Sequence, residues 1–339
     1  MAIINGALFD RAMENNCIRI AGKNAQIHSF NQDGSGIYRQ SVNSSGTDVD
    51  DIRFNLKKSD MGIMAKFKEL TVEKDNETLR CTDGSGRFSI QNLVDLHEVN
   101  PNLRDVKDIG LPWEDFKKTA GFLGKNSGMT VCSTGVMAYD KNMEMMYKRK
   151  IELDAADAYV LPAEILKYTD KEIEYQLKTN RKMLCAMANG EMVYSSVMKG
   201  LTSSIPVNYD PQLSGWFEIQ NLEELQEHLK FGSSFGTMVF LTIDSGKVLH
   251  LRTISGTDDP RSYEAQMKID TNISRIGIAF QIAGLLKILT LADPDQPVRL
   301  YLDNGRMRFD TDNEFAILGG IRTPENVNIV LEEEHDGTE

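Results

Sequence analysis

Histidine and cysteine most often carry catalysis or bind metals, and in this chain both residue types are scattered. The five histidines are isolated from one another, and a surface or hydrogen-bonded histidine explains each more simply than a ligand does. Cys17, Cys81, Cys132 and Cys185 are widely spaced without a Cys-x-x-Cys pair, which indicates reduced thiols in a cytosolic protein. The sequence therefore predicts no metal site and no redox centre.

Glycine-rich and aspartate-rich turns were the other candidates for chemistry. Gly34–Gly36 and Gly84–Gly86 look like parts of a dinucleotide-binding loop, but each follows Asp between expected strands, so turns are the simpler interpretation. Asp293–Asp295 and Asp310–Asp312 could hold a metal ion, although they more simply mark a helix end and a strand edge. No phosphate-binding lysine loop is present. We therefore expect a protein without catalytic activity or cofactor.

Composition and charge limit the kinds of protein that this chain could be. The 339 residues suit two or three soluble domains, and the net charge is −12. Any contact with nucleic acid must then come from a local basic surface, while the acidity alone indicates no more than solubility. No apolar run of about 18–20 residues could span a bilayer, and the N-terminal residues lack the pattern of a signal peptide. We expect a cytoplasmic protein.

The elements that would position a site follow an order that recurs along the chain. The last copy is the clearest. Arg275–Phe280 alternates like a strand, and Gln281–Ala292 places apolar residues at helical spacing. The strands Val298–Asp303 and Arg306–Thr311 then flank an Asn-Gly turn, which predicts a hairpin, and a last strand follows at Glu314–Ile321.

Each copy is predicted to contain two helices, each followed by antiparallel strands. The helices are expected at Gly6–Asn16, Leu56–Phe67, Pro112–Leu123, Leu161–Thr169, Asn221–Lys230 and Gln281–Ala292. The class is therefore α+β. Polar, proline-containing stretches place the domains at 1–105, 106–205 and 206–339. Chance matching is the alternative, because hairpins and amphipathic helices are common patterns.

Three segments carry a resemblance to the DNA sliding clamps. Residues 276–289 (IGIAFQIAGLLKIL) look like the family's strand-then-helix segment, with Gln281 where Asn is usual. Residues 315–322 (FAILGGIR) resemble its closing Tyr-aliphatic-aliphatic-Met-Pro-aliphatic-Arg segment, with two glycines in place of Met-Pro. Residues 130–138 (TVCSTGVMA) are similar to its Thr-Val-Ala-Thr-Asp-Gly-His-Arg-Leu segment. The pattern resembles the beta subunit of bacterial DNA polymerase III, and the divergence favours a phage or other mobile-element version.

The resemblance implies a fold and a function. Each of three clamp-type domains would carry two helices on an inner face and antiparallel sheets outside. Three domains would make half of a ring, so that a head-to-tail homodimer encircles duplex DNA and tethers a replicative polymerase. The runner-up is a non-ring interaction or virion structural protein built from repeated sandwiches, and an enzyme is the third possibility.

Basic residues on the inner helices would contact phosphates without reading bases, which suits sliding. The candidates are Arg11, Lys57, Lys58, Lys66, Lys68, Lys117, Lys118, Lys125, Lys167 and Lys287. Lys117 and Lys118 form the best cluster, and a solvated helix face is the alternative for each residue. Residues 222–228 (LEELQEH) are acidic, which departs from a uniformly basic wall.

The family's clamps also bind short peptide motifs of the polymerase and clamp loader, in an apolar pocket between the second and third domains. The resemblance places its wall at Ser133, Gly135, Ala138, Pro206, Tyr209, Ile317, Leu318 and Ile321. Such a pocket would bury an apolar side chain as an anchor. For Ile317 and Leu318 the alternative is an ordinary place in the core.

Overall fold

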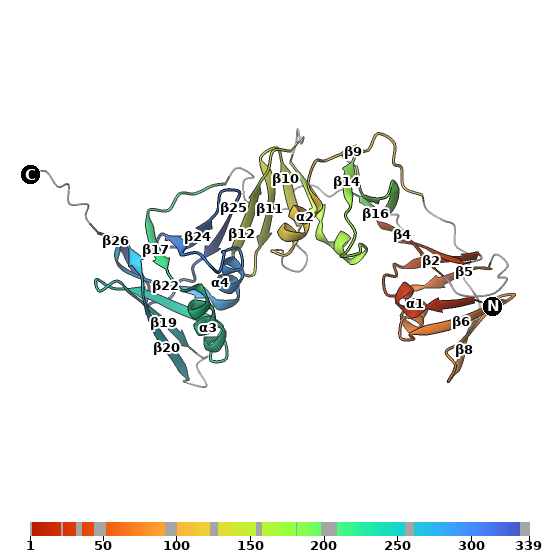
Figure 1. Cartoon of the computed structure of the whole chain (residues 1–339), viewed down its shortest axis with the longest axis horizontal. Helices are drawn as coiled ribbons and strands as arrows, with labels where there is room; N and C mark the ends of the chain where they lie inside the picture. Colours follow the sequence, from red (N-terminus) through yellow and green to blue (C-terminus); the bar gives the residue numbers. More distant parts are fainter. Residues whose placement is uncertain are drawn as a thin grey trace, which may run out of the picture. The chain divides into compact units, whose positions relative to one another are not determined.

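The computed structural model describes residues 2–21, 23–31, 36–43, 52–91, 100–122, 128–153, 158–180, 182–197, 209–254 and 261–332. The chain divides into two compact units, residues 1–114 with 161–200 and residues 115–160 with 201–339. Within the described ranges the units hold antiparallel sheets, four α-helices and two 3-10 turns, so the predicted α+β class is confirmed (Figure 1). None of the helices in these ranges is long and apolar enough to cross a membrane.

The first unit contains two sheets. The smaller has the order β1 (Ala2–Asn5), β6 (Glu69–Asp75), β7 (Thr78–Thr82), β8 (Arg87–Gln91). The larger has the order β5 (Ile52–Lys57), β2 (Asn15–Ala21), β3 (Asn24–Phe30), β4 (Gly36–Asn43), β16 (Glu191–Val197), β15 (Met183–Ala188), β14 (Gln176–Thr179), β9 (Lys107–Asp108). The helix α1 (Lys58–Met64) follows β5 directly.

The core of the first unit joins both sheets to α1. Ile18, Ile20 and Ile27 lie on one face of the larger sheet, because side chains alternate along a strand. Met61 and Met64 of α1 are fully buried in the same cluster. The opposite face of β2 and β3 is therefore left to polar side chains and to a separate small apolar cluster.

The second unit also contains two sheets. The larger has the order β13 (Tyr159–Pro162), β10 (Gly128–Cys132), β11 (Gly135–Asp140), β12 (Met145–Lys150), β25 (Glu314–Gly319), β24 (Arg306–Asp310), β23 (Val298–Leu302), β17 (Gly215–Ile219), β21 (Asp270–Thr271). The smaller has the order β20 (Ser262–Lys268), β19 (Val248–Ile254), β18 (Met238–Ile243), β22 (Ile273–Gln281), β26 (Val327–Leu331). Leu225 and Leu229 of α3 (Leu222–Gly232) pack with Leu285 and Ile288 of α4 (Ile282–Leu289) in the core of this unit.

The compact units do not follow the predicted repeat boundaries. Strands of the middle repeat join both large sheets: β16 pairs with β4, and β12 pairs with β25. Each half of the middle repeat thus shares a sheet with a neighbouring repeat. The division into domains 1–105, 106–205 and 206–339 stays a prediction.

The helix predicted at Gly6–Asn16 is wrong. Only η1 (Gly6–Phe9) is helical, as a 3-10 turn, and β2 already includes Asn16. The Asn16 side chain is fully buried and donates to the carbonyls of Met13 (3.0 Å) and Leu56 (3.2 Å). These bonds and the pairing of β2 on both sides hold the segment in the sheet, because tertiary pairing outweighs a weak helical preference.

Four of the other five predicted helices are found with shorter or shifted ends, and the α-helix predicted at Leu161–Thr169 is wrong. The predicted ranges Leu56–Phe67, Pro112–Leu123, Asn221–Lys230 and Gln281–Ala292 correspond to α1, α2 (Trp113–Ala120), α3 and α4. The range Leu161–Thr169 contains only the 3-10 turn η2 (Ala163–Lys167). Asn221 caps α3, since its side chain accepts a hydrogen bond from the Glu224 amide at 3.1 Å.

Aspartate side chains cap two of the predicted turns. The Asp83 carboxylate accepts hydrogen bonds from the amides of Ser85 (3.0 Å) and Gly86 (2.7 Å), so this glycine-rich segment is a capped turn. Asp293 accepts from the Asp295 amide at 3.0 Å in the same way, just after α4. Within the described ranges no group of three or more His, Cys, Asp or Glu is arranged to hold a metal ion. Most of Gly34–Gly36 lies outside the described residues.

Candidate nucleic-acid interface and exposed sheet edges

The predicted DNA-binding residues around α1 have their charged ends at the surface. Lys57 and Lys58 are exposed at the N-terminal end of the helix, and Lys66 and Lys68 are exposed just after its C-terminal end. Two buried methionines anchor the opposite side of α1 in the core. The helix α1 and its flanking residues therefore present four ammonium groups that can reach an external phosphate.

The other two predicted DNA-binding residues of the first unit, Lys167 and Arg11, differ in exposure. Lys167 is exposed in the last turn of η2. Arg11 is half-buried beside Tyr38. Burial raises the pKa of Tyr38 to about 12, although the neighbouring Arg11 guanidinium acts in the opposite direction, so the phenol is protonated at neutral pH. Arg11 thus belongs to a partly buried polar group rather than to the exposed lysines.

The predicted DNA-binding lysines of the second unit contact residues of that same unit. Lys118 Nζ lies 2.6 Å from Glu314 Oε1, and the Glu314 side chain is only 5 % exposed. Glu314 Oε2 accepts a hydrogen bond from the Tyr147 hydroxyl at 2.5 Å and is 3.4 Å from Arg149 Nη1. Arg149 Nε also pairs with Asp115 at 2.9 Å. Lys118 is therefore 43 % exposed but paired with a buried carboxylate, and Lys117 beside it is half-buried.

Lys287 of α4 is also held by its own unit. Its ammonium lies 5.6 Å from the centre of the Phe122 ring, and burial lowers its pKa. Phe122 in turn stacks on Tyr147 with ring centres 4.3 Å apart and an interplanar angle of 7°. Lys125 lies outside the described residues. The predicted lysines are therefore exposed around α1 and η2, whereas Lys118 is paired with Glu314 and Lys287 is partly buried.

The structure divides the predicted partner pocket between two faces of one sheet. Ala138 and Leu318 lie in the main core beneath α4, where a Cβ added to Gly284 would come within 2.6 Å of Leu318. Ile317 lies in a second cluster on the other face, against which Tyr209 packs. Neighbours in a strand point to opposite faces, so Ile317 and Leu318 cannot line one pocket.

The other predicted pocket residues differ in their exposure. Ser133 is exposed, Ile321 is half-buried, and Pro206 lies outside the described residues. Gly135 is buried with φ +138°, and an added Cβ would lie 2.0 Å from the Arg149 carbonyl oxygen. The backbone conformation and this close approach therefore require glycine at 135, whether or not a peptide binds nearby.

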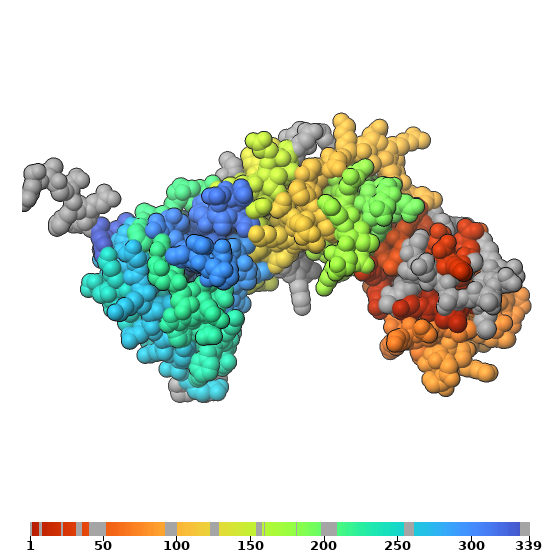
Figure 2. All heavy atoms as spheres, in the orientation of Figure 1, coloured from red at the N-terminus to blue at the C-terminus, as the bar shows by residue number. Residues whose placement is uncertain are grey.

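Sequence reasoning missed an exposed aromatic cluster in the second unit. Phe231 at the end of α3 is 57 % exposed, and its ring centre lies 5.0 Å from that of Tyr263 in β20. Phe235 stacks on Tyr263 at 5.9 Å, and His228 Nδ1 is 2.7 Å from the Tyr263 hydroxyl. β20 is an edge strand, and it and α3 reach the surface of this unit in Figure 2. Large exposed apolar groups beside a free edge indicate an interaction surface.

A second exposed edge lies in the first unit. β8 ends the four-stranded sheet, and Phe88 in β8 stacks on Phe67 at 5.2 Å. Ile63 on α1 is 46 % exposed. Lys66, Lys68 and Arg87 are exposed around this edge together with Glu69 and Asp83, whereas Glu223, Glu224, Glu227 and Glu264 are exposed around the β20 edge together with Lys230, Arg261 and Lys268. Basic residues thus slightly outnumber acidic ones at the first edge, and the reverse holds at the second.

Solved structures show which fold this is. The beta clamp of Helicobacter pylori bound to a DNA ligase peptide matches with a TM-score of 0.72 at 11 % identity, covering 95 % of this chain and 99 % of that one. The DNA polymerase III subunit beta of Borrelia burgdorferi matches with a TM-score of 0.70 at 11 % identity over the same shares. That of Pseudomonas aeruginosa matches with a TM-score of 0.68 at 12 % identity, covering 95 % of this chain and 100 % of that one. This chain has the fold of a DNA sliding clamp.

The clamp fold extends over nearly the whole chain and over the full length of these neighbours. No protein-family model and no curated protein matches the sequence. The predicted resemblance to clamps is therefore confirmed at the level of fold, with few identical residues behind it. A likeness at this identity fixes the arrangement of elements and leaves the roles of individual residues to be argued from this chain.

Proposed function

We propose that this chain is a DNA sliding clamp, a non-catalytic processivity factor that encircles duplex DNA and tethers a replicative polymerase. The observation that carries the proposal is the clamp fold along 95 % of the chain. The second support is the pair of sheet edges at β8 and β20, to which no strand of the described ranges pairs. The cytoplasm of a bacterial or phage-infected cell is the compartment that fits this role.

The ring would be closed by two copies joined head to tail. In this arrangement β8 of one copy pairs with β20 of the other, and Ile63 and Phe88 meet Phe231 and Tyr263. The lysines around Phe67 then face the glutamates of α3. Such an interface is heterologous and self-limiting when the rotation closes. Pairing at both junctions would also remove the free edges that otherwise invite aggregation.

DNA would be held by charge rather than by sequence. The exposed lysines at α1 and η2 (Lys57, Lys58, Lys167) are the candidates that remain free to contact phosphates in the first unit. Lys66 and Lys68 flank Phe67 at the proposed junction and would serve the subunit contact. Phosphate contacts without base contacts permit sliding.

A short peptide of the polymerase or clamp loader would bind at the predicted pocket. The Helicobacter pylori neighbour is a clamp bound to a DNA ligase peptide. In this chain a polymerase or clamp-loader peptide would have to contact the predicted pocket through Ser133, Tyr209 and Ile321, because the other described members are buried.

Charge reversal at α1 tests the DNA contact. The double variant Lys57→Glu/Lys58→Glu is expected to weaken equilibrium binding to a short linear duplex by about tenfold at moderate salt, because two phosphate contacts are replaced by repulsion. Fluorescence anisotropy of the labelled duplex measures the dissociation constant. Lys182→Glu, at an exposed lysine in the β14–β15 turn, is the matched control and should leave it unchanged.

Two outcomes would count against this assignment. An unchanged dissociation constant in the double variant would remove α1 from the DNA-binding surface. A monomer that binds no circular DNA at all would instead favour a non-ring interaction or virion structural protein.

A further inference from the structure

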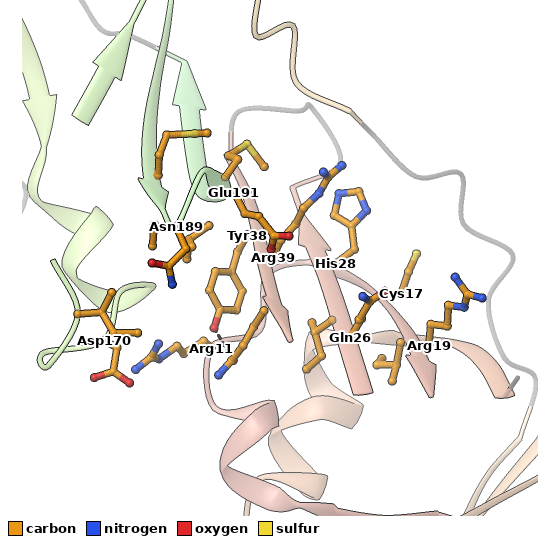
Figure 3. Close-up of a pocket in the computed structure, with 18 of the residues that line it drawn as sticks. Arg11, Cys17, Arg19, Gln26, His28, Tyr38, Arg39, Asp170, Asn189 and Glu191 are labelled. Atoms are coloured by element: carbon orange, nitrogen blue, oxygen red, sulfur yellow. Dashed lines mark hydrogen bonds between the residues drawn. The ribbon is translucent and has the colours of Figure 1, made fainter. Parts of the chain in front are cut away.

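The first unit contains a cavity that the proposed clamp function does not use. Its volume is about 1050 Å³, at the upper end of the range for ligand pockets. It opens where β4 and the β15–β16 hairpin separate, and residues from β2, β3, β5 and the segment after η2 complete its wall (Figure 3). None of its lining residues belongs to the predicted partner pocket, whose described members all lie in the second unit.

The cavity lies at a fork in the eight-stranded sheet. β4 and β16 pair at three positions only, from Gly36↔Ser196 to Tyr38↔Tyr194. β4 continues to Asn43 while pairing with β3 alone, and β16 begins at Glu191 while pairing with β15 alone. In the described part of the chain, Arg39 and Gln40 of β4 and Glu191–Val193 of β16 thus line the cavity along two strand edges without a ladder between them. An extended polypeptide can add to such edges through its main chain.

The charges around the fork are predominantly basic. Arg11, Arg19, Arg39 and Arg53 line the cavity, against the carboxylates of Asp170 and Glu191. This is a local excess of positive charge in a chain whose net charge is −12. The labelled arginines lie around the cavity on both sides of Tyr38 in Figure 3. A carboxylate placed between them would gain charge-assisted hydrogen bonds.

One arginine pair strengthens this point. Arg19 in β2 and Arg53 in β5 are direct cross-strand partners, and both are exposed. The two guanidinium-bearing side chains therefore lie side by side on the same face of the sheet, where they add to the positive charge of this wall.

We propose that this cavity binds an extended, acidic peptide segment of a protein partner as an added β-strand. Main-chain hydrogen bonds to β4 or β16 would hold the segment, and alternate side chains would reach the two faces of the fork. Arg39 and Arg19 would contact acidic side chains on one face, and Arg11 would do so on the other. Nucleic acid fits the fork less well, because it lacks the main-chain donors and acceptors that strand edges recognise.

A labelled decapeptide of alternating Glu and Val tests the proposal on the full chain by fluorescence anisotropy. It is expected to bind, whereas the alternating Lys-Val decapeptide does not. Arg39→Glu should weaken binding by about tenfold or more, through loss of a charge-assisted contact and added repulsion. The matched control is Arg80→Glu in β7, whose arginine pairs with Asp75 on the other sheet of the same unit and lies outside the cavity. It should bind like the wild type.

Amide hydrogen exchange provides a readout that does not depend on a substitution. Bound peptide should slow exchange at residues 39–41 or 191–193, and thermal unfolding of Arg39→Glu should match that of the wild type. Equal binding of the Lys-Val peptide, equal loss in Arg80→Glu, unprotected amides at the fork or no binding of the Glu-Val peptide would each overturn the proposal. Tighter Arg39-dependent binding of single-stranded oligothymidine would reassign the cavity to nucleic acid.

Discussion

Replacing Phe231 by arginine is expected to convert a dimer into a monomer. Phe231 is 57 % exposed at the end of α3, beside the free edge of β20. In the proposed ring it is buried against the partner's β8 edge, and the new guanidinium would face Lys66 and Lys68 there. Loss of a central aromatic anchor together with like-charge repulsion should raise the dimer dissociation constant by about 100-fold, roughly 3 kcal/mol.

The chain offers a matched control for this variant. Val330 in β26 is 50 % exposed, at the opposite edge of the same five-stranded sheet. Val330→Arg therefore introduces the same group at similar exposure outside the proposed junction, and the dimer should persist. Sedimentation equilibrium measures both constants. Equal dissociation constants for the two variants would show that the β20 edge is not the subunit junction, and Ile63→Arg should repeat the Phe231→Arg result from the other side.

Glu314→Gln is expected to destabilise the second unit by about 3 kcal/mol, since removal of one partner from a buried ion network leaves the others uncompensated. Glu314 connects Lys118, Tyr147 and Arg149, and its side chain is 5 % exposed. We expect the lower end of the usual range, because Lys118 is 43 % exposed and water can solvate its ammonium. Urea unfolding followed by tryptophan fluorescence measures the free energy of unfolding.

Glu325→Gln controls for the chemistry of the change. Glu325 pairs with Arg252 at the surface, with both side chains at least 39 % exposed. Loss of such a pair should cost less than about 1 kcal/mol. If the two variants lose the same stability, the Glu314 network stabilises the unit no more than a surface ion pair does. Lys118 would then be available to contact DNA.

Short sequence patterns predicted the elements that are set by interactions between residues close together in the chain. The Asn304-Gly305 turn correctly placed the β23–β24 hairpin, and Asn221 correctly marked the start of α3. The segment before Asn16 was misjudged because a buried asparagine fixes it in the sheet through contacts with Leu56, forty residues away. Such a partner is not visible in a local pattern.

The candidate sites were harder to predict for the same reason. The sequence predicts Lys118 as a DNA contact, with a solvated helix face as the alternative, whereas its partner Glu314 is 196 residues further along the chain. Ile317 and Leu318 were assigned to one pocket, although alternation along β25 already sends them to opposite faces. The exposed Phe231 cluster had a weak signal, two phenylalanines four residues apart at the end of an otherwise acidic helix.

Retention on circular against linear DNA tests the central claim most directly. Dilution of the protein to monomers, followed by concentration in the presence of a nicked plasmid, lets subunits close around the DNA without a loader. A topological link survives salt that abolishes ordinary phosphate contacts, since only the latter depend on counterion release. We predict a half-life on the circle that is insensitive to salt and that falls by more than about tenfold after a single restriction cut, because a ring slides off free ends. Equal half-lives on circular and linear DNA would contradict the ring.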